Sequence, residues 1–368
     1  MFQAGGAARM IIAPRLAHPV APQPSNRNHR YCYLAEMGDE ATRSRVDTVY
    51  RDALVWDSHA GVYPDPRTDL AGLENWRQAG ISFVSLNVVY DIPTWETAFP
   101  VLAAYRRYIE SNLDRYLIVD TTDDVKRAKR EGKLAVGFDL EGMCALNGDL
   151  DMVSLLHRLG VRQALFAYNL NNEVGGGCHD KDIGLTEFGR TVVQEMNRVG
   201  MIVDCSHSAC RTTMEAMDIS TDPVVFSHSN PKAVWDHDRN ITDDQIRACA
   251  ATGGVVGVTG LGIFLGANDS STNTMVEHAC YLAELVGPEH VGIGLDHIFD
   301  DLDLTEELSA RPDYWPPGQG YDTPNIIGAQ PGQIYEICDQ LLARGFSDTE
   351  VTGILGGNFL RVAQQVWG

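Results

Sequence analysis

The chain has 368 residues, of which 44% are hydrophobic, 21% charged and 8% aromatic. This composition is typical of a globular protein with a sizeable core and excludes a disordered or fibrous chain. The 50 acidic residues outnumber the 29 Lys and Arg residues, so the formal net charge is −21. Because a surface of this sign repels phosphate backbones and anionic lipids, we expect neither nucleic acid nor a membrane as a partner.

The N-terminal stretch differs from the rest of the chain. Residues 1–36 are rich in Pro, Ala, Asn and Arg without a periodic pattern, so we expect a flexible tail, and Met37 is a more natural start. Its apolar patch has four residues, where a secretory signal needs about 7 to 15, and no apolar run approaches the roughly 20 residues that span a bilayer. A soluble, cytoplasmic protein is expected. The eight cysteines form no CxxC pair, which favours small buried side chains in a reducing compartment.

From about Asp39 onwards, helical and strand patterns alternate to the C-terminal end. The helical segment EATRSRVDTVYRDAL leads into the first strand, and short connections with Gly, Asp or Pro separate the later elements. Near-continuous apolar runs are typical of parallel strands that are covered on both faces. Eight such runs predict strands at residues 55–59, 81–88, 134–142, 161–169, 201–207, 223–229, 254–260 and 290–297, with a ninth candidate at 115–122.

Eight parallel strands alternating with helices over about 300 residues predict an α/β fold, a (β/α)8 TIM-type barrel. A doubly wound open sheet usually has fewer strands and a glycine-rich phosphate-binding turn after the first. Neither GxGxxG nor GxxxxGK[ST] follows the first predicted strand. We therefore expect residues 37–368 to form a single barrel domain.

Five ionisable residues stand near the carboxyl ends of predicted strands, where the functional side chains of a barrel gather. A buried ionisable group is costly unless it is paired or bound to a metal. Imidazole and carboxylate ligands suit Zn²⁺ or a similar divalent ion, and a site open to the barrel mouth leaves room for water. The sequence thus predicts a metal site with His59, Glu141, His207 and His228 as ligands and Asp296 beside them.

A metal ion at this site indicates the chemistry. It lowers the pKa of bound water and polarises a carbonyl oxygen, so hydrolysis of an amide or related bond is its natural use. Asp296 would accept and donate the proton. No rival nucleophile stands out, because the chain has no GxSxG and strand alternation turns Cys205 away from the face of its neighbours.

Several longer motifs lie between about residues 54 and 364, in this order: VWDSH, AVGFDLEG, GLTEFGRTVVQEMNRVGMIVDCSHSA, PVVFSHSNPKAV, DRNITDDQIR, HVGIGLDH and GGNFLRV. Their sequence and order resemble the membrane dipeptidase family of zinc peptidases, also called peptidase family M19, in the amidohydrolase group of barrels. The resemblance implies a (β/α)8 barrel, commonly a dimer, with two zinc ions and a dipeptide substrate.

The resemblance also implies roles for the five ionisable residues. Glu141 would bridge the two ions, His207 and His228 would complete one of them, and the first-strand motif containing His59 would complete the other. The family's eighth-strand aspartate matches Asp296.

The expected substrate site has one matching motif and one departure. The family's Arg-Asn motif, whose arginine binds the substrate carboxylate, matches Arg239 and Asn240. Tyr168 stands where the family usually has a histidine near the substrate carbonyl. A tyrosine can still donate a hydrogen bond, but its greater reach and higher pKa change the geometry of the pocket and the transfer of protons.

A second departure weakens one metal position. The family's first strand normally ends His-x-Asp, with both residues as ligands, whereas this chain reads His-Ala-Gly and ends on Gly61. Glu141, His207 and His228 alone make a three-ligand site with an open position. We therefore expect one secure zinc ion and a second one held weakly by His59 and Glu141.

The glycine-rich loop NNEVGGGCHDKDIG places Cys178, His179 and Asp180 together. Such a loop could supply the missing ligand or form a lid over the mouth, because flexible loops can bring side chains to a site. An ordinary surface loop with exposed polar residues is the third alternative, and the sequence leaves all three open.

We expect a metal-dependent hydrolase that cleaves a dipeptide or a related small amide with a free carboxylate. One alternative is a reaction on a non-peptide amide, lactam or small acid at a mononuclear site. Another is a non-catalytic barrel that has lost part of its metal centre, but an abandoned site has no physical need for a buried acid cluster. A homodimer is suggested by the resemblance alone.

Overall fold

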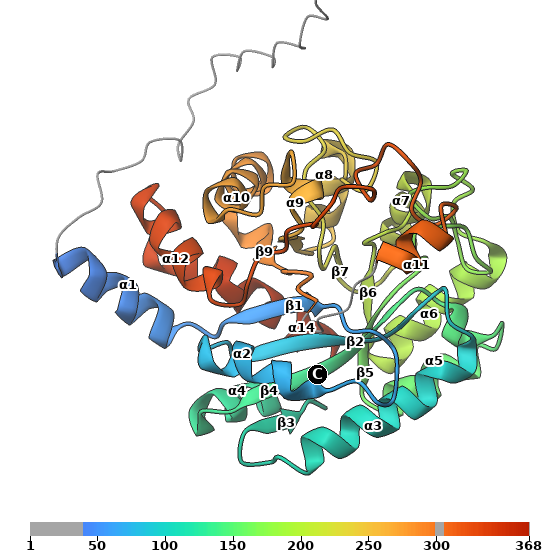
Figure 1. The fold of residues 1–368 in the computed structure, drawn as a ribbon, viewed down its shortest axis with the longest axis horizontal. Helices are drawn as coiled ribbons and strands as arrows, with labels where there is room; N and C mark the ends of the chain where they lie inside the picture. Colours follow the sequence, from blue (N-terminus) through green and yellow to red (C-terminus); the bar gives the residue numbers. More distant parts are fainter. Residues whose placement is uncertain (1–39, 299–304, 368) are drawn as a thin grey trace, which may run out of the picture.

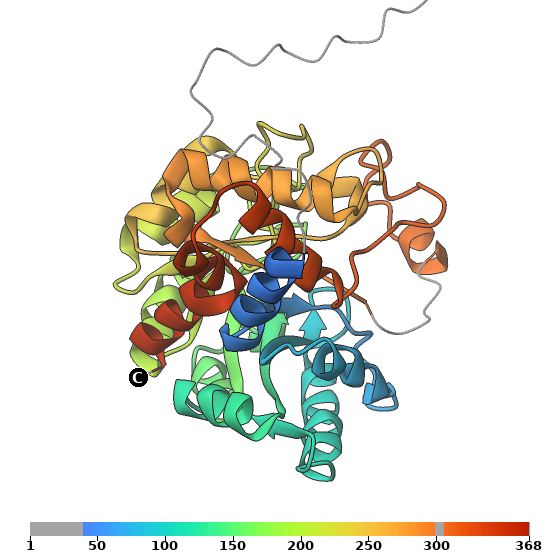
Figure 2. The same ribbon diagram turned by 90° about the vertical axis from the view of Figure 1, so that its left-hand side faces the viewer.

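The computed structural model describes residues 40–298 and 305–367, so the predicted tail at 1–36 lies outside the described residues. A curled sheet of parallel strands lies at the centre of the molecule, and helices surround it (Figures 1 and 2). All eight predicted strands form, together with the ninth candidate. The strands are β1 (Trp56–Ala60), β2 (Phe83–Tyr90), β3 (Tyr116–Ile118), β4 (Leu134–Glu141), β5 (Val161–Leu165), β6 (Ile202–Asp204), β7 (Val224–Val225), β8 (Val256–Val258) and β9 (Val291–Ile293).

The strands are ordered along the chain, as expected for a barrel. β1, β2, β4, β5, β6 and β7 pair in parallel in that order, β3 lies along the first residues of β4, and β8 pairs with β9. A parallel bridge between Phe226 and Val256 joins the end of β7 to β8. The amide of Asp296 donates to the carbonyl of His59 at 3.1 Å, which joins the end of β9 to β1. The sheet thus closes on itself, and the predicted α/β barrel is confirmed.

Several strands end earlier than the apolar runs predicted. β5 ends at Leu165, β6 at Asp204 and β7 at Val225, whereas the predicted strands continued to 169, 207 and 229. Beyond β5, β6 and β9 the backbone enters the left-handed region, since Asn169 and His207 have a φ of +60° and Asp296 a φ of +56°. These turns place polar side chains over the carboxyl ends of the strands.

The helices bury one apolar face and begin and end at recognisable caps. In α6 the Thr186 hydroxyl accepts the amide N–H of Gly189 at 3.0 Å, and Gly200 ends the helix with a φ of +79°. The helices are α1 (Glu40–Asp52), α2 (Leu73–Gln78), α3 (Ala98–Glu110), α4 (Thr122–Glu131), α5 (Asp151–Arg158), α6 (Glu187–Val199), α7 (Cys210–Ile219), α8 (Asp243–Ala251), α9 (Gly262–Leu265), α10 (Thr272–Val286), α11 (Thr305–Ala310), α12 (Gln333–Ala343), α13 (Asp348–Thr352) and α14 (Asn358–Val366).

Close packing inside the barrel brings the first strand against the later ones. Ser58 Oγ lies 2.6 Å from the carbonyl oxygen of Ser227. Gly294 lies in the same layer, and a Cβ atom at this position would overlap that carbonyl oxygen, so only glycine fits. As a result the imidazoles of His59 and His228 stack, with ring centres 3.9 Å apart.

The lengths of the helices and the burial of the cysteines bear on two of the expectations from the sequence. None of the helices within residues 40–298 and 305–367 is long and apolar enough to cross a membrane. Seven cysteines lie in this part, and all are free thiols. Four of them are buried as predicted, whereas Cys144 and Cys178 are partly exposed and Cys210 is exposed.

Candidate metal centre

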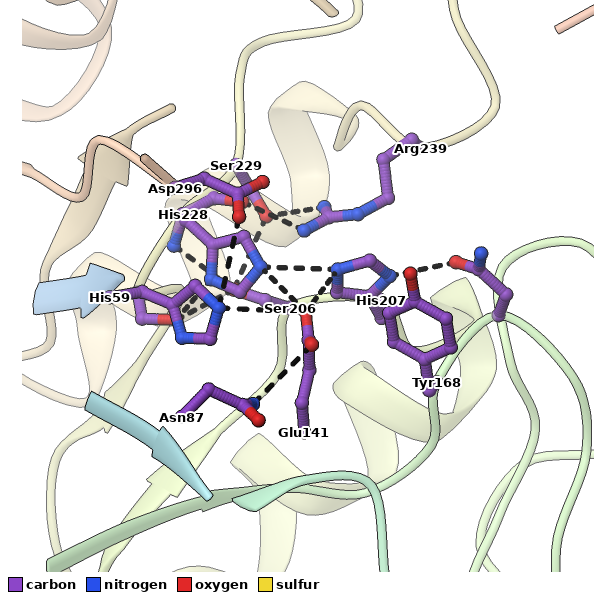
Figure 3. Close-up of polar contacts among 12 residues, drawn as sticks. His59, Asn87, Glu141, Tyr168, Ser206, His207, His228, Ser229, Arg239 and Asp296 are labelled. Atoms are coloured by element: carbon purple, nitrogen blue, oxygen red, sulfur yellow. Dashed lines mark hydrogen bonds and ion pairs between the residues drawn. The ribbon is translucent and has the colours of Figure 1, made fainter. Parts of the chain in front are cut away.

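The five ionisable residues that the sequence singled out lie together at the carboxyl ends of the strands (Figure 3). His59 belongs to β1 and Glu141 is the last residue of β4, while His207, His228 and Asp296 follow β6, β7 and β9. All five are buried, with at most 8% of each residue exposed. The barrel therefore concentrates three imidazoles and two carboxylates in a site that solvent hardly reaches.

The three imidazoles direct the same ring nitrogen at one carboxylate oxygen. The Nε2 atoms of His207, His228 and His59 lie 2.9, 3.4 and 3.6 Å from Oε1 of Glu141. Figure 3 shows the Glu141 carboxylate pointing up between the rings. The Nε2 atoms of His207 and His228 lie 3.1 Å apart. Three potential nitrogen ligands thus lie around one carboxylate oxygen.

These residues fit a divalent metal ion. One ligand atom from each of His59, Glu141 and His228 lies within 4.8 Å of the others. Neither ring nitrogen of His59 makes a hydrogen bond within the described part of the chain, although both are buried. A buried polar atom without a hydrogen bond is costly, and a metal ion bound to Nε2 would remove that cost. His207 adjoins the group through Glu141 and His228.

Each imidazole is held from behind at its other nitrogen. Asn169 Oδ1 lies 2.7 Å from Nδ1 of His207, and Ser227 Oγ lies 2.7 Å from Nδ1 of His228. Asp139 Oδ1 lies 3.3 Å from Nδ1 of His59, an ion-pair contact outside hydrogen-bond geometry. Contacts of this kind orient metal-binding histidines and set which ring nitrogen carries the proton. The Nε2 atoms are consequently left for the ion.

The electrostatics separate His59 from the other two histidines. Burial holds the pKa of His207 and of His228 well below the ordinary value, so both rings are neutral and suited to bind a cation. Burial also lowers the pKa of His59, but the carboxylates of Asp139 and Glu141 outweigh it and raise this pKa to about 10. Binding of a metal to His59 would therefore release a proton.

The two carboxylates of the site resist ionisation. Burial raises the pKa of Glu141 to about 8 against the opposing charge of His59. Burial likewise raises the pKa of Asp296, whose Oδ1 lies 3.8 Å from Nε2 of His59. A carboxyl group whose pKa is raised can exchange a proton nearer to neutral pH, which is the property of a general acid and base.

Asn87 is a site residue that the sequence pattern did not reveal. It lies in β2, within an apolar run, and its Nδ2 contacts Glu141 Oε2 at 3.4 Å and Asp139 Oδ1 at 3.3 Å. Its amide thereby connects the carboxylate at the centre of the site with the one behind His59. An amide side chain in a strand whose other polar residue is the small Ser85 was the available signal.

A cavity of about 1120 Å³ opens above the metal centre. Glu141, His207 and Asp296 form part of its floor, and Gly61 and Tyr168 also line it. The remaining lining residues come mainly from the segments at 62–63, 261–264, 297–298, 308–317 and 321–330. The cluster is therefore accessible from one side to a small molecule.

Tyr168 contacts both the metal centre and the opposite wall. Its ring stacks on that of His207, with centres 4.6 Å apart and planes 29° apart. The indole N–H of Trp315 donates to the Tyr168 hydroxyl at 3.2 Å. Because this oxygen accepts a hydrogen bond, its own O–H remains available as a donor towards the cavity.

Arg239 and Asn240 lie deeper than substrate-binding residues were expected to. The Arg239 guanidinium donates to Ser229 Oγ at 3.0 Å and to the carbonyl of His228 at 2.9 Å. The Asn240 amide donates to the carbonyl of Phe264 at 2.8 Å. Neither residue belongs to the cavity lining within the described part of the chain. In this conformation both support the loops around the site.

Gly61 lines the cavity but has no side chain that could bind a metal ion. A Cβ atom there would lie 3.0 Å from Cγ1 of Ile298 and 3.8 Å from Oδ1 of Asp296. A carboxylate at this position would thus point towards the metal centre, but Ile298 occupies the adjoining space. The weakness of a second metal position stays a prediction.

The glycine-rich loop directs its side chains elsewhere. The Cys178 thiol contacts Asn169 Oδ1 at 3.5 Å, and Nε2 of His179 lies 2.8 Å from the Tyr321 hydroxyl. Asp180 accepts the amide N–H of Asn171 at 3.1 Å. In the described part of the chain, no residue of this loop joins the group of potential ligands. The loop is connected to the site through Asn169, whose Oδ1 contacts both the Cys178 thiol and Nδ1 of His207.

Cys205 was set aside as a nucleophile, and its surroundings agree. The residue is fully buried, and burial raises the pKa of its thiol well above the ordinary value. A thiol of this kind stays protonated and unreactive.

A parallel barrel with histidines and carboxylates at the carboxyl ends of its strands belongs to the class of barrels that can hold a catalytic metal ion. Comparison with known proteins is more specific. Residues 76–310 match the profile of the membrane dipeptidase family, peptidase family M19. Since this match covers more than half of the chain, the chain belongs to the membrane dipeptidase family.

Curated relatives include three fungal dipeptidases. An uncharacterised dipeptidase of Schizosaccharomyces pombe is 32% identical over 67% of this chain and 57% of its own length. The dipeptidase tcpJ of Claviceps purpurea is 30% identical over 73% of this chain and 59% of its own length. The dipeptidase verJ of Clonostachys rogersoniana is 32% identical over 70% and 62%. The chain thus spans about six-tenths of the length of these relatives.

Solved structures share the fold over almost the whole described chain. An amidohydrolase from Pseudomonas aeruginosa has a TM-score of 0.80 and 28% identity, covering 88% of this chain and 99% of its own. A metallopeptidase from Rhodobacter sphaeroides, solved with a phosphinate mimic of the dipeptide L-Ala-D-Ala, has a TM-score of 0.70 and 20% identity. It covers 86% of this chain and 100% of its own, and at this identity it shows the fold alone.

Proposed function

We propose that this chain is a zinc-dependent hydrolase that cleaves dipeptides or closely related small amides with a free carboxylate. The observation that carries the proposal is the convergence of three imidazole Nε2 atoms on Oε1 of Glu141 beneath an open cavity. The similarity to dipeptidases from three fungi supports the substrate class.

The residues that would hold the ion are His59, Glu141, His207 and His228. A bound zinc ion would supply an activated water and polarise the carbonyl of the scissile bond. Asp296, buried beside His59, would accept the proton of the water and pass it to the leaving amine. The Tyr168 hydroxyl, directed by Trp315, would donate a hydrogen bond to the substrate carbonyl.

Arg239 would bind the substrate carboxylate after a small rearrangement. Its Nε makes no hydrogen bond within the described residues. The charge of its guanidinium, after that of His59, opposes the burial that raises the pKa of Asp296. An Arg239→Lys variant should raise the Michaelis constant for dipeptides more than it lowers kcat. If the Michaelis constant is unchanged, Arg239 is a structural residue.

The central test compares zinc content and hydrolysis of Ala-Ala by the zinc-loaded full chain with those of two variants. His228→Ala should lose bound zinc and activity together, whereas Asp296→Asn should keep zinc and lose about 10² to 10⁴-fold in kcat. His157→Gln, a change on the outer helix α5, is the matched control and should match the unchanged chain. Zinc binding without hydrolysis of any dipeptide would refute the proposed substrate class.

A further inference from the structure

The segment at 311–330, between α11 and α12, covers one side of the cavity and is tied to the site at several points. The Trp315 indole donates to the Tyr168 hydroxyl at 3.2 Å, and the Asn169 amide donates to the carbonyl of Tyr314 at 3.0 Å. The Tyr321 hydroxyl lies 2.8 Å from Nε2 of His179. Because Tyr168 and Asn169 both contact His207, this segment and the metal centre form one unit.

One wall of the cavity is a set of packed aromatic rings. The ring centre of Tyr168 lies 5.3 Å from that of Tyr90 and 6.1 Å from that of Trp315, the latter at an edge-to-face angle of 78°. All three residues line the cavity, and Tyr168 also stacks on His207. We call these three residues the aromatic wall. It stands directly beside the metal centre.

The charges around the cavity restrict what can lie against this wall. The lining residues that the structure describes include the carboxylates Glu141, Asp296 and Asp322 but no Lys or Arg. An acidic substrate side chain against this wall would lose its hydration without finding a Lys or Arg among the described lining residues, which is costly. Aromatic faces and edges instead attract other rings and apolar groups.

The size of the cavity points in the same direction. Pockets for drug-sized ligands usually measure about 300–1,000 Å³, and this one measures about 1120 Å³. A dipeptide with two small side chains would leave much of that space filled with water. A substrate with a bulky group would bury the aromatic wall and gain the free energy of apolar burial.

We infer that the aromatic wall of Tyr90, Tyr168 and Trp315 is a specificity subsite for a large, uncharged aromatic group next to the scissile amide. The inference deepens the proposed function and rests on it. Trp315 is the main determinant, because its ring lines the cavity while its N–H orients Tyr168.

The first experiment compares kcat/KM of the zinc-loaded chain for Phe-Ala, Ala-Phe, Ala-Ala, Glu-Ala and Ala-Glu. At least one aromatic dipeptide should exceed Ala-Ala by about tenfold or more, from the burial of one large side chain. Both acidic dipeptides should be poorer substrates than Ala-Ala. Equal values for the aromatic dipeptides and Ala-Ala, or a preference for an acidic one, would overturn the inference.

Two substitutions locate the preference. Trp315→Ala should reduce the ratio of aromatic to Ala-Ala activity by about tenfold, whereas Trp315→Phe keeps a ring and should keep most of this ratio. Trp95→Ala, which removes a tryptophan outside the cavity lining, is the matched control. A ratio that is unchanged in Trp315→Ala, in protein with normal zinc content, contradicts the assignment of the subsite.

A binding measurement separates this inference from the proposed function. Calorimetric titration of the zinc-loaded chain with N-acetyl-phenylalanine methylamide and N-acetyl-alanine methylamide needs no turnover. If no dipeptide is hydrolysed but the phenylalanine compound binds about tenfold more tightly, the subsite stands and the proposed reaction fails. If dipeptides are hydrolysed and the two compounds bind equally, the reaction stands and the subsite fails.

Discussion

The Nε2 atoms of His207 and His228 face each other at 3.1 Å, and burial keeps both rings neutral by lowering their pKa values. Each ring is fixed from behind, His207 by Asn169 and His228 by Ser227. Two neutral imidazoles that are held in this way present their lone pairs to one point, which is the arrangement that binds a cation. We therefore expect metal binding to depend on Asn169 and Ser227 as well as on the two histidines.

Removing that support should weaken metal binding without removing a ligand. Ser227→Ala and Asn169→Ala should each lower zinc affinity about 10 to 100-fold, because the imidazoles lose their fixed orientation. Competition with a fluorescent zinc chelator measures this change. Ser229→Ala is a matched control, since the Ser229 hydroxyl contacts Arg239 and Ser206 but no imidazole. If Ser229→Ala costs as much affinity as Ser227→Ala, general loosening of the loop explains the loss.

The number of zinc ions depends on Gly61. We expect one tightly bound ion per chain, because the described site offers no carboxylate at this position, and elemental mass spectrometry of purified protein measures it. The double variant Gly61→Asp, Ile298→Ala supplies the carboxylate and clears the space beside it, so its content should approach two. Gly61→Asn with Ile298→Ala is the uncharged control and should stay near one. Two tightly bound ions in the unchanged chain would disprove this expectation.

Much of the fold could be predicted from the sequence because parallel strands that are covered on both faces are apolar throughout. This pattern located all strands but not their ends. His207 and Asp296 leave the strand conformation through positive φ angles, and hydrophobicity does not record such turns. The short pairing of β7, over Val224–Val225, is likewise set by the neighbouring strands.

The candidate ligands could be named in advance because ionisable residues at the ends of apolar strands are conspicuous. The residues that hold these ligands in place could not be named from the sequence. Ser227 and Asn87 lie in or beside apolar runs. Asn169 contacts His207 from a turn of the backbone, where its φ is +60°. Trp315 belongs to a segment rich in Pro and Gly without periodicity, so its contact with Tyr168 arises only in three dimensions.

The Tyr168 hydroxyl can be tested separately from its ring. Tyr168→Phe keeps the stacking on His207 but removes the hydrogen bond that the hydroxyl would give to the substrate carbonyl. We expect kcat/KM for a dipeptide to fall about tenfold, the effect of losing one such bond in the transition state, with zinc content unchanged. Activity equal to that of the unchanged chain would show that Tyr168 serves the cavity wall only.

Stability at acidic pH should depend on His278, a residue of α10 that is not among the potential metal ligands. The residue is fully buried in α10, and its Nε2 lies 2.9 Å from the carbonyl oxygen of Leu265. Burial lowers its pKa from 6.5 to about 4, although the contact with Leu265 opposes this shift. Between these two pH values His278 is therefore mostly neutral in the folded chain and mostly protonated in the unfolded chain.

The sign of the effect follows from this difference. Between pH 6.5 and 4 the unfolded state binds more protons, so the free energy of unfolding falls as the pH falls, whereas above pH 6.5 His278 adds no pH dependence. Its share of the loss between pH 7.5 and pH 5 is about 2 kcal/mol. His278→Gln keeps a donor for Leu265 and has no titrating ring, so urea unfolding at the two pH values should show a loss smaller by that amount. An identical loss in both proteins would mean that His278 gains a proton in the folded state as readily as in the unfolded one.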